Sequence, residues 1–236
     1  MSKKKLDPAE MTAEEAYEQG MRSYRGHRYA KAVTFLEAAE SKGSRWATRQ
    51  LAFMKMKGQG MERNISVGYK KLLALAKELQ HAESYVEVAD FLCQQTYPFL
   101  TFDEILELYD KAIALGSITA LREKGLTLLA TLGHPSEEAL DCLNKASEAG
   151  DSQASLDLAM TYLHNLFIET SGDLAVKYFI RAYEQGEKDV AVKLGYTYLY
   201  MLEPNKKNLD QAIHWLKIAA KEGDVDAIQT LMTLEK

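Results

Sequence analysis

The sequence predicts an all-α protein, a right-handed α-solenoid of about six helix-turn-helix repeats of about 36 residues that ends in a C-terminal capping helix. The first observation is a set of turn positions that fall 37, 36, 34, 36 and 37 residues apart, namely Gly43, Gln80, Gly116, Gly150, Gly186 and Gly223. The second is that an alanine precedes each of them by four residues. Self-similarity at this period is typical of stacked helical hairpins.

Helix-breaking residues divide the repeats into two predicted helices each. They lie at Gly58-Gln59-Gly60, Tyr97-Pro98, Gly133-His134-Pro135, Ser171-Gly172 and Pro204-Asn205. The first helices of the repeats are predicted at 9–25, 44–57, 81–95, 117–131, 151–166 and 187–201. The second helices are predicted at 28–42, 64–79, 102–115, 136–149, 173–185 and 207–222. A thirteenth helix, 224–235, closes the array.

The side-chain pattern inside these segments favours helix over strand, because apolar residues recur at spacings of three and four. One such stripe consists of Leu209, Ala212, Ile213, Leu216, Ala219 and Ala220. Where two helices of a hairpin cross closely, alanine or glycine on one admits a bulky side chain from the other. We expect that bulky role for Leu36, Leu73, Tyr109, Leu143, Phe179 and Leu216.

The composition is that of an ordinary folded protein, with 47% hydrophobic and 27% charged residues. We expect a disordered N-terminus over residues 1–8 and one repeat domain over 9–236. The net charge is −5 and the basic residues are scattered, which argues against a nucleic-acid partner. No apolar segment follows Lys3–Lys5 as in a signal peptide, and no run of about eighteen apolar residues predicts a membrane span. Cys93 and Cys142 occupy different repeat positions, so we expect reduced thiols in a cytoplasmic protein.

Catalytic and metal-binding patterns are weak. The histidines His27, His81, His134, His164 and His214 form no pair at helical metal-site spacing. The chain contains no Gly-x-Ser-x-Gly, no phosphate-binding glycine loop and no Cys-x-x-Cys. We therefore expect a protein that is not an enzyme and that uses no cofactor and no metal.

The last full repeat, Gly186 to Gly223, carries the clearest family pattern: Leu194-Gly195, Tyr198, Trp215-Leu216 and Ala219-Ala220. These residues resemble the Sel-one-like repeat family, which is related to the tetratricopeptide repeats. The resemblance covers about 43–235, and residues 16–43 look closer to a plain tetratricopeptide unit. Gln80, Lys124 and Ile105 depart from the pattern. Secreted relatives that bind penicillins have a disulfide in each unit, and this chain lacks those cysteine pairs, so their activity is not carried over.

The resemblance implies that the first helices line a concave inner face, and the exposed positions there are the candidate partner-binding residues. These are Tyr17, Met21, Tyr24, Trp46, Arg49, Phe53, Met56, Val86, Asp90, Arg122, Leu126, Met160 and Tyr196. The face is unusually apolar for a solvated groove, which indicates a protein or peptide partner. Trp46, Arg49 and Phe53 form the best candidate hot spot. The alternative is that such side chains pack between repeats, which is most plausible for Leu156, Val192 and Leu199.

The sequence leaves three functions open, of which the third has the least support. The first is a cytoplasmic adaptor that recruits a protein or peptide through its concave face. The second is a bacterial immunity protein that binds and neutralises a toxin, because similar short Sel-one-like proteins have this role and an acidic surface complements a basic toxin. The third is an enzyme, for which the sequence contains no catalytic constellation.

Overall fold

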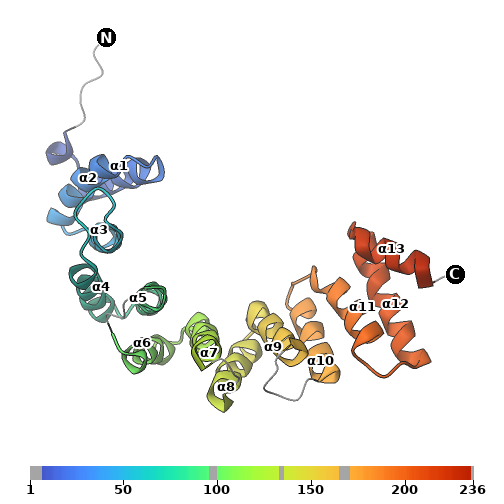
Figure 1. The fold of residues 1–236 in the computed structure, drawn as a ribbon. Coiled ribbons are helices and arrows are strands. Elements are labelled where there is room, and N and C mark those ends of the chain that lie inside the picture. The colour runs from blue at the N-terminus through green and yellow to red at the C-terminus, as the bar shows by residue number, and fades with distance from the viewer. Residues whose placement is uncertain (1–6, 96–99, 133–135, 165–170, 235–236) are drawn as a thin grey trace, which may run out of the picture. The chain divides into compact units, whose positions relative to one another are not determined.

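The structure, a computed structural model, describes residues 7–95, 100–132, 136–164 and 171–234. All the regular elements in these ranges are helical (Figure 1). The chain divides into two compact units, 1–116 and 117–236. Within the described ranges no helix has both the length and the apolar character that crossing a membrane requires. Most of the predicted disordered start, 1–8, lies outside the described residues.

Unit 1 contains three helical hairpins. Its elements are η1 (Pro8–Glu10), α1 (Ala13–Arg25), α2 (Tyr29–Ser41), α3 (Arg45–Lys57), α4 (Ile65–Leu79), α5 (Ala82–Cys93) and α6 (Phe102–Ala114). The hairpin pairs are α1 with α2, α3 with α4 and α5 with α6, and neighbouring hairpins meet through α2 with α3 and α4 with α5. We call the surface formed by α1, α3 and α5 the first-helix face of unit 1.

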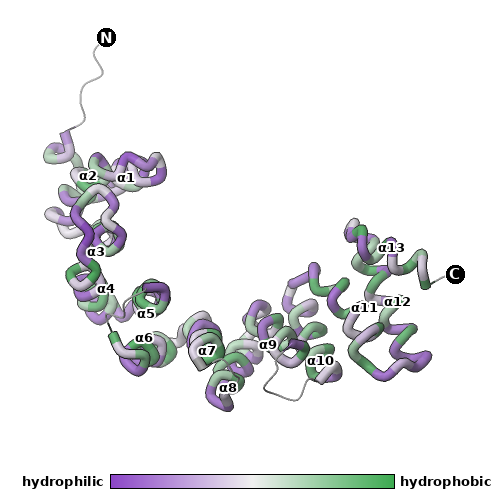
Figure 2. The backbone as a smooth tube through the Cα atoms, in the orientation of Figure 1, coloured by the Kyte–Doolittle hydropathy of each residue, from purple (hydrophilic) through white to green (hydrophobic). Residues whose placement is uncertain are grey.

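Unit 2 repeats the same arrangement. Its elements are α7 (Ile118–Leu132), α8 (Glu137–Glu148), α9 (Ser152–His164), α10 (Gly172–Glu184), α11 (Val190–Tyr200), α12 (Lys206–Lys221) and α13 (Val225–Leu234). The hairpins are α7 with α8, α9 with α10 and α11 with α12, and α13 packs on α12. The all-α solenoid class and the predicted order of paired helices are therefore confirmed. In both units, hydrophobic and hydrophilic residues alternate along the helices (Figure 2).

Local hydrogen bonds explain where the helices begin and turn. The predicted first helix 9–25 is interrupted, because Thr12 caps α1 and exchanges hydrogen bonds with Glu15 in a capping box. The predicted breakers at 97–98 and 133–135 lie outside the described residues, as do the last residues of the predicted helix 151–166. The recurrent turn positions all have positive φ, including Gln80 at 51°, whose side chain donates to the Lys77 carbonyl. The turn thus survives where glycine is replaced.

Small residues set the distance between paired helices, as the sequence predicts. A Cβ atom on Gly20, Gly125 or Gly195 would lie 2.6–2.8 Å from the Cγ atom of a leucine on the second helix of the hairpin. Those leucines, Leu36, Leu143 and Leu216, are fully buried. Glycine therefore gives the room into which each leucine packs.

Lys124 replaces a leucine of the family pattern without leaving the core. It is only 8% exposed, and its Nζ atom lies 2.8 Å from Glu138 Oε1 on α8. The aliphatic stem fills the apolar position while the ammonium group reaches a carboxylate at the surface. A departure from the repeat pattern is in this way accommodated by the length of the lysine side chain.

Candidate partner-binding pocket

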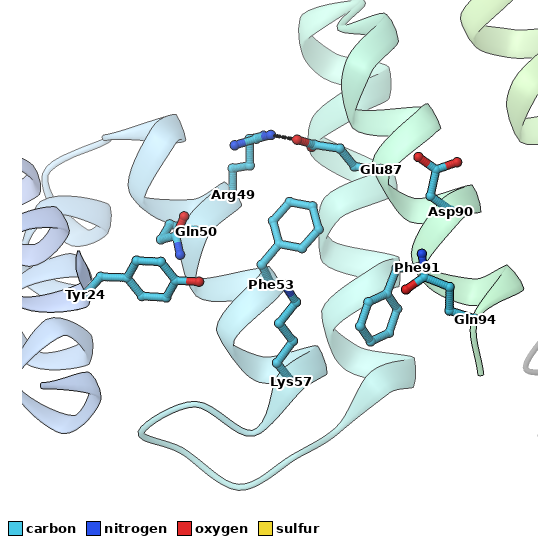
Figure 3. A pocket seen from close by; sticks show the side chains of 9 residues that line it. All are labelled: Tyr24, Arg49, Gln50, Phe53, Lys57, Glu87, Asp90, Phe91 and Gln94. Atoms are coloured by element: carbon cyan, nitrogen blue, oxygen red, sulfur yellow. Dashed lines mark hydrogen bonds and ion pairs between the residues drawn. The ribbon is translucent and has the colours of Figure 1, made fainter. Parts of the chain in front are cut away.

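A pocket of about 440 Å³ opens on the first-helix face of unit 1. Its walls come from the last turn of α1, from α3 and from α5 (Figure 3). The lining side chains are Tyr24, Arg49, Gln50, Phe53, Lys57, Glu87, Asp90, Phe91 and Gln94. Three successive first helices thus contribute to one hollow.

Helical spacing explains why these side chains meet. Arg49, Phe53 and Lys57 follow one another at intervals of four along α3, and Glu87 and Asp90 are three apart on α5. Side chains three or four residues apart lie on the same side of a helix. Figure 3 shows the side chains of α3 and α5 facing the space between the two helices.

An ion pair between Arg49 and Glu87 bridges α3 and α5 at the edge of the pocket (Figure 3). The Arg49 guanidinium carbon also lies 5.3 Å from the centre of the Phe53 ring, within range of a cation–π contact. Among the described residues, Arg49 Nε and Glu87 Oε2 are buried and have no hydrogen-bond partner. Leaving a buried polar atom unpaired costs about 1–3 kcal/mol. The pocket wall therefore retains one donor and one acceptor that its own side chains do not satisfy.

Asp90 is the second carboxylate of the pocket. Its Oδ1 atom accepts a hydrogen bond of 2.7 Å from the Tyr109 hydroxyl of α6. Burial raises the pKa of Asp90, and the Tyr109 hydrogen bond opposes the rise. Within the described ranges no lysine, arginine or histidine forms an ion pair with Asp90. The carboxylate is thus partly desolvated and is stabilised by a neutral donor.

The structure brings four of the predicted partner-binding residues together in this pocket: Tyr24, Arg49, Phe53 and Asp90. Trp46 lies one turn before Arg49 on α3 and is not part of the lining. It is 52% exposed, and its ring meets His81 edge-on with 5.8 Å between ring centres. The expected hot spot of Trp46, Arg49 and Phe53 is therefore split between the pocket and its surroundings.

Two of the predicted positions are wrong as surface residues. Met56 is 0% exposed because it packs against Gly68 of α4, where an added Cβ atom would lie 2.3 Å from Met56 Cγ. Val86 is 5% exposed on α5, a helix that packs against both α4 and α6. Neither side chain is accessible to a partner in the folded protein.

The remaining predicted residues lie outside the pocket. Tyr17 and Met21 are half-buried against the core of unit 1. In unit 2, Leu126 and Met160 pack against the core cluster. Leu156 does so too, as expected if it packs between repeats and does not face a partner. Tyr196 stacks on Tyr200 and its hydroxyl lies 3.2 Å from Thr230 Oγ1.

Arg122 is the unit 2 counterpart of Arg49. Its Nε donates to Asp157 Oδ2 at 2.6 Å, and its NH1 donates to Glu123 at 2.9 Å. Burial raises the pKa of Asp157 although the contacts with Arg122 act in the opposite direction. Arg122 is therefore occupied by two carboxylates of its own unit.

Five lining residues were not predicted from the sequence: Gln50, Lys57, Glu87, Phe91 and Gln94. Four of them could have been found from helical spacing. Lys57 lies four residues after Phe53. Glu87 lies three residues before Asp90, Gln94 lies four residues after Asp90, and Phe91 lies four residues after Glu87. Gln50 follows Arg49 directly and has no such signal. The prediction considered one position per turn, whereas a pocket between helices uses a wider strip of each helix.

Among the described residues, no serine, cysteine or histidine lines the pocket. Across the described residues, no group of three or more histidine, cysteine, aspartate or glutamate side chains could hold a metal ion. Cys142 is buried, and burial raises the pKa of its thiol, which disfavours the nucleophilic thiolate. Cys93 is exposed near Tyr109, with 4.0 Å between its Sγ atom and the hydroxyl oxygen.

Comparisons with known proteins agree with the fold. The Sel1 repeat family model matches residues 47–70, 136–151, 152–187 and 189–224. A Sel1 repeat protein from Oxalobacter formigenes is 21% identical and superposes with a TM-score of 0.57 over 92% of this chain and 89% of its own. A protective antigen of uropathogenic Escherichia coli that displays an SLR fold is also 21% identical, with a TM-score of 0.59 over 93% of this chain. This chain spans 48% of the length of that antigen.

An immunity protein from Pseudomonas aeruginosa, Pa5087, is 19% identical, with a TM-score of 0.46 over 91% of this chain and 83% of its own. No curated protein sequence matches the chain. The chain therefore contains Sel1 repeats in these four segments, and it shares its fold with solved Sel1 repeat proteins.

Proposed function

We propose that this chain is a non-enzymatic protein-binding scaffold that holds a protein or peptide partner in the unit 1 pocket. Sel1 repeats generally serve as protein-interaction scaffolds. The observation that carries the proposal is the pocket itself, which gathers three aromatic rings and four charged side chains from successive repeats. Aromatic residues and arginine are enriched among the anchors of protein interfaces.

The polar side chains of the wall support the same function. Lys57 presents donors and Asp90 presents acceptors at the pocket, and a bound main chain or side chain supplies both acceptors and donors. A partner would therefore gain hydrogen bonds as well as contact area.

A narrower form of the proposal is that the partner is a toxin, which the chain would neutralise as an immunity protein. The net charge of −5 favours a basic partner and fast association with it. One partner bound at nanomolar affinity would support this form. Several partners bound weakly would support a general adaptor.

The test is affinity capture followed by binding measurements with the purified partner. The full chain, Phe53→Ala and the control Tyr200→Ala are compared, since Tyr200 is an aromatic residue of unit 2 that is 69% exposed. We expect Phe53→Ala to lose the partner and Tyr200→Ala to retain it, with both variants folded by circular dichroism. Equal binding by the wild type and Phe53→Ala would refute the pocket as the site.

A further inference from the structure

We propose that the unit 1 pocket selects a basic side chain, an arginine or a lysine of the partner, and places its cation against Asp90 beside the Phe91 ring. This inference rests on the proposed function and specifies the chemistry of the partner at that site. It follows from the distribution of charge within the pocket.

The four charges of the pocket are not all compensated in the same way. Arg49 is held by Glu87, and this pair bridges α3 and α5. Lys57 lies at the end of α3, and Figure 3 shows it across the hollow from Asp90. Asp90 is left with the neutral Tyr109 hydroxyl as its donor. Among the described residues, Lys57 and Asp90 therefore have no ion-pair partner, and the pocket has a negative charge on the α5 wall and a positive charge at the end of α3.

The surroundings of Asp90 favour a cation over a neutral ligand. Glu87 lies three residues before Asp90 on the same side of α5 and lines the same pocket. Partial burial makes an unpaired carboxylate costly, and a cation that enters the pocket offsets this cost. A partner glutamate or aspartate placed against the α5 wall would instead meet two carboxylates.

The aromatic lining suits the same ligand. Phe91 follows Asp90 directly on α5, and Figure 3 shows its ring at the pocket with Phe53 on the opposite wall. On the α3 wall, the Arg49 guanidinium already makes a cation–π contact with the Phe53 ring. A cation of the partner could contact the Phe91 ring in the same way. An arginine of the partner has both the planar cation that stacks on a ring and the donors that a carboxylate accepts. A lysine has the charge and the flexible stem.

The experiment uses the ¹⁵N-labelled full chain and four blocked tetrapeptides, acetyl-Ala-Phe-Xaa-Ala-amide, with Xaa as arginine, lysine, leucine or glutamate. Binding is followed by amide chemical shifts. We expect the arginine and lysine peptides to shift resonances of residues 49–57 and 87–94 and to bind about tenfold more tightly than the leucine peptide, with the difference shrinking as salt is added. The glutamate peptide should bind most weakly.

Two variants and a control separate charge from structure. Asp90→Asn should bind the arginine and leucine peptides equally. Asp103→Asn, the same change at an exposed position of α6, should behave as the wild type. Tyr109→Phe removes the neutral donor and keeps the carboxylate, so it should retain the preference for arginine. This last variant keeps the test decisive if Asp90→Asn is poorly folded.

The outcomes distinguish this inference from the proposed function. If all four peptides shift the pocket resonances equally, the pocket binds peptides and the selection of a basic side chain is wrong. If the arginine peptide shifts no pocket resonance at millimolar concentration, the inference is overturned as well. Only retention of the captured partner by Phe53→Ala overturns the proposed function.

Discussion

The first-helix faces of the two units share one ion pair and differ in the side chains beside it. Arg49 pairs with Glu87 in unit 1, and Arg122 pairs with Asp157 at the equivalent repeat positions in unit 2. Four residues after each arginine stands Phe53 or Leu126, and three residues after each carboxylate stands Asp90 or Met160.

The side chains that stand beside the ion pair decide whether the first-helix face carries a pocket. Leu126 and Met160 pack against the core of unit 2, whereas Phe53 and Asp90 line the pocket of unit 1. The same repeat positions therefore line a hollow in unit 1 and pack against the core in unit 2. The repeat fixes where a site can form, and the residues at these positions determine whether one does.

The largest effect is expected from exchanging the two side chains. Met160→Asp places a carboxylate against the apolar cluster of unit 2, which should lower the free energy of unfolding by about 2–3 kcal/mol. Asp90→Met should have a smaller effect on unit 1, because it removes a partly desolvated carboxylate together with the hydrogen bond from Tyr109. Urea unfolding followed by circular dichroism measures both. A neutral Met160→Asp would show that the face of unit 2 is as open as that of unit 1.

A second comparison separates binding from stability. Leu126→Ala should lower the free energy of unfolding by about 1–2 kcal/mol, less than the roughly 2–5 kcal/mol for truncating a fully buried leucine, because Leu126 is only partly buried. Phe53→Ala should cost less stability and weaken partner binding by more than about tenfold. Denaturation curves and binding isotherms of the two variants test this. Similar losses of stability would mean that Phe53 belongs to the core.

A smaller effect concerns the pH dependence of stability. Because the pKa of Asp90 is raised in the folded protein, the folded state holds this proton more tightly than the unfolded chain. The contribution of Asp90 to stability therefore decreases as the pH rises from the ordinary aspartate pKa through the raised value. Asp90→Asn lacks this loss, so its stability relative to the wild type should increase over that interval. Urea midpoints measured between about pH 3 and 7 check the sign, and an opposite trend would contradict the burial of Asp90.

The smallest effect is expected at Trp46, which lies outside the pocket lining. Trp46→Ala should change the unfolding free energy by no more than about 0.5 kcal/mol, as is usual for exposed positions. It should weaken partner binding less than Phe53→Ala does. A larger loss of binding for Trp46→Ala would move the centre of the interface toward His81 and the start of α3.

Much of the fold could be predicted because the repeat is encoded locally. Turn positions, small residues and caps such as Asp151 and Asp224 each act within a few residues, so the sequence displays them directly. The site could be predicted only in part. Met56 lies at a position that helical spacing puts on the first-helix face. Because Gly68 on the next helix has no side chain, Met56 packs into the space beside it and is buried.

Contacts between repeats are the part that no single repeat reveals. The pairing of Arg49 with Glu87 joins residues of different hairpins, and the pocket takes its lining from three hairpins, through α1, α3 and α5. In unit 2 the apolar residues that look like a binding stripe are used for packing between helices. Apolar character alone therefore does not separate a binding face from a packed one.

Hydrogen exchange of the full chain, with and without its captured partner, tests most directly whether the pocket of unit 1 is the binding site. We expect the partner to slow amide exchange in residues 49–57 and 87–94 and to leave residues 122–129 and 156–163 of unit 2 unchanged. Slowed exchange confined to unit 2, with the pocket segments unaffected, would contradict the assignment.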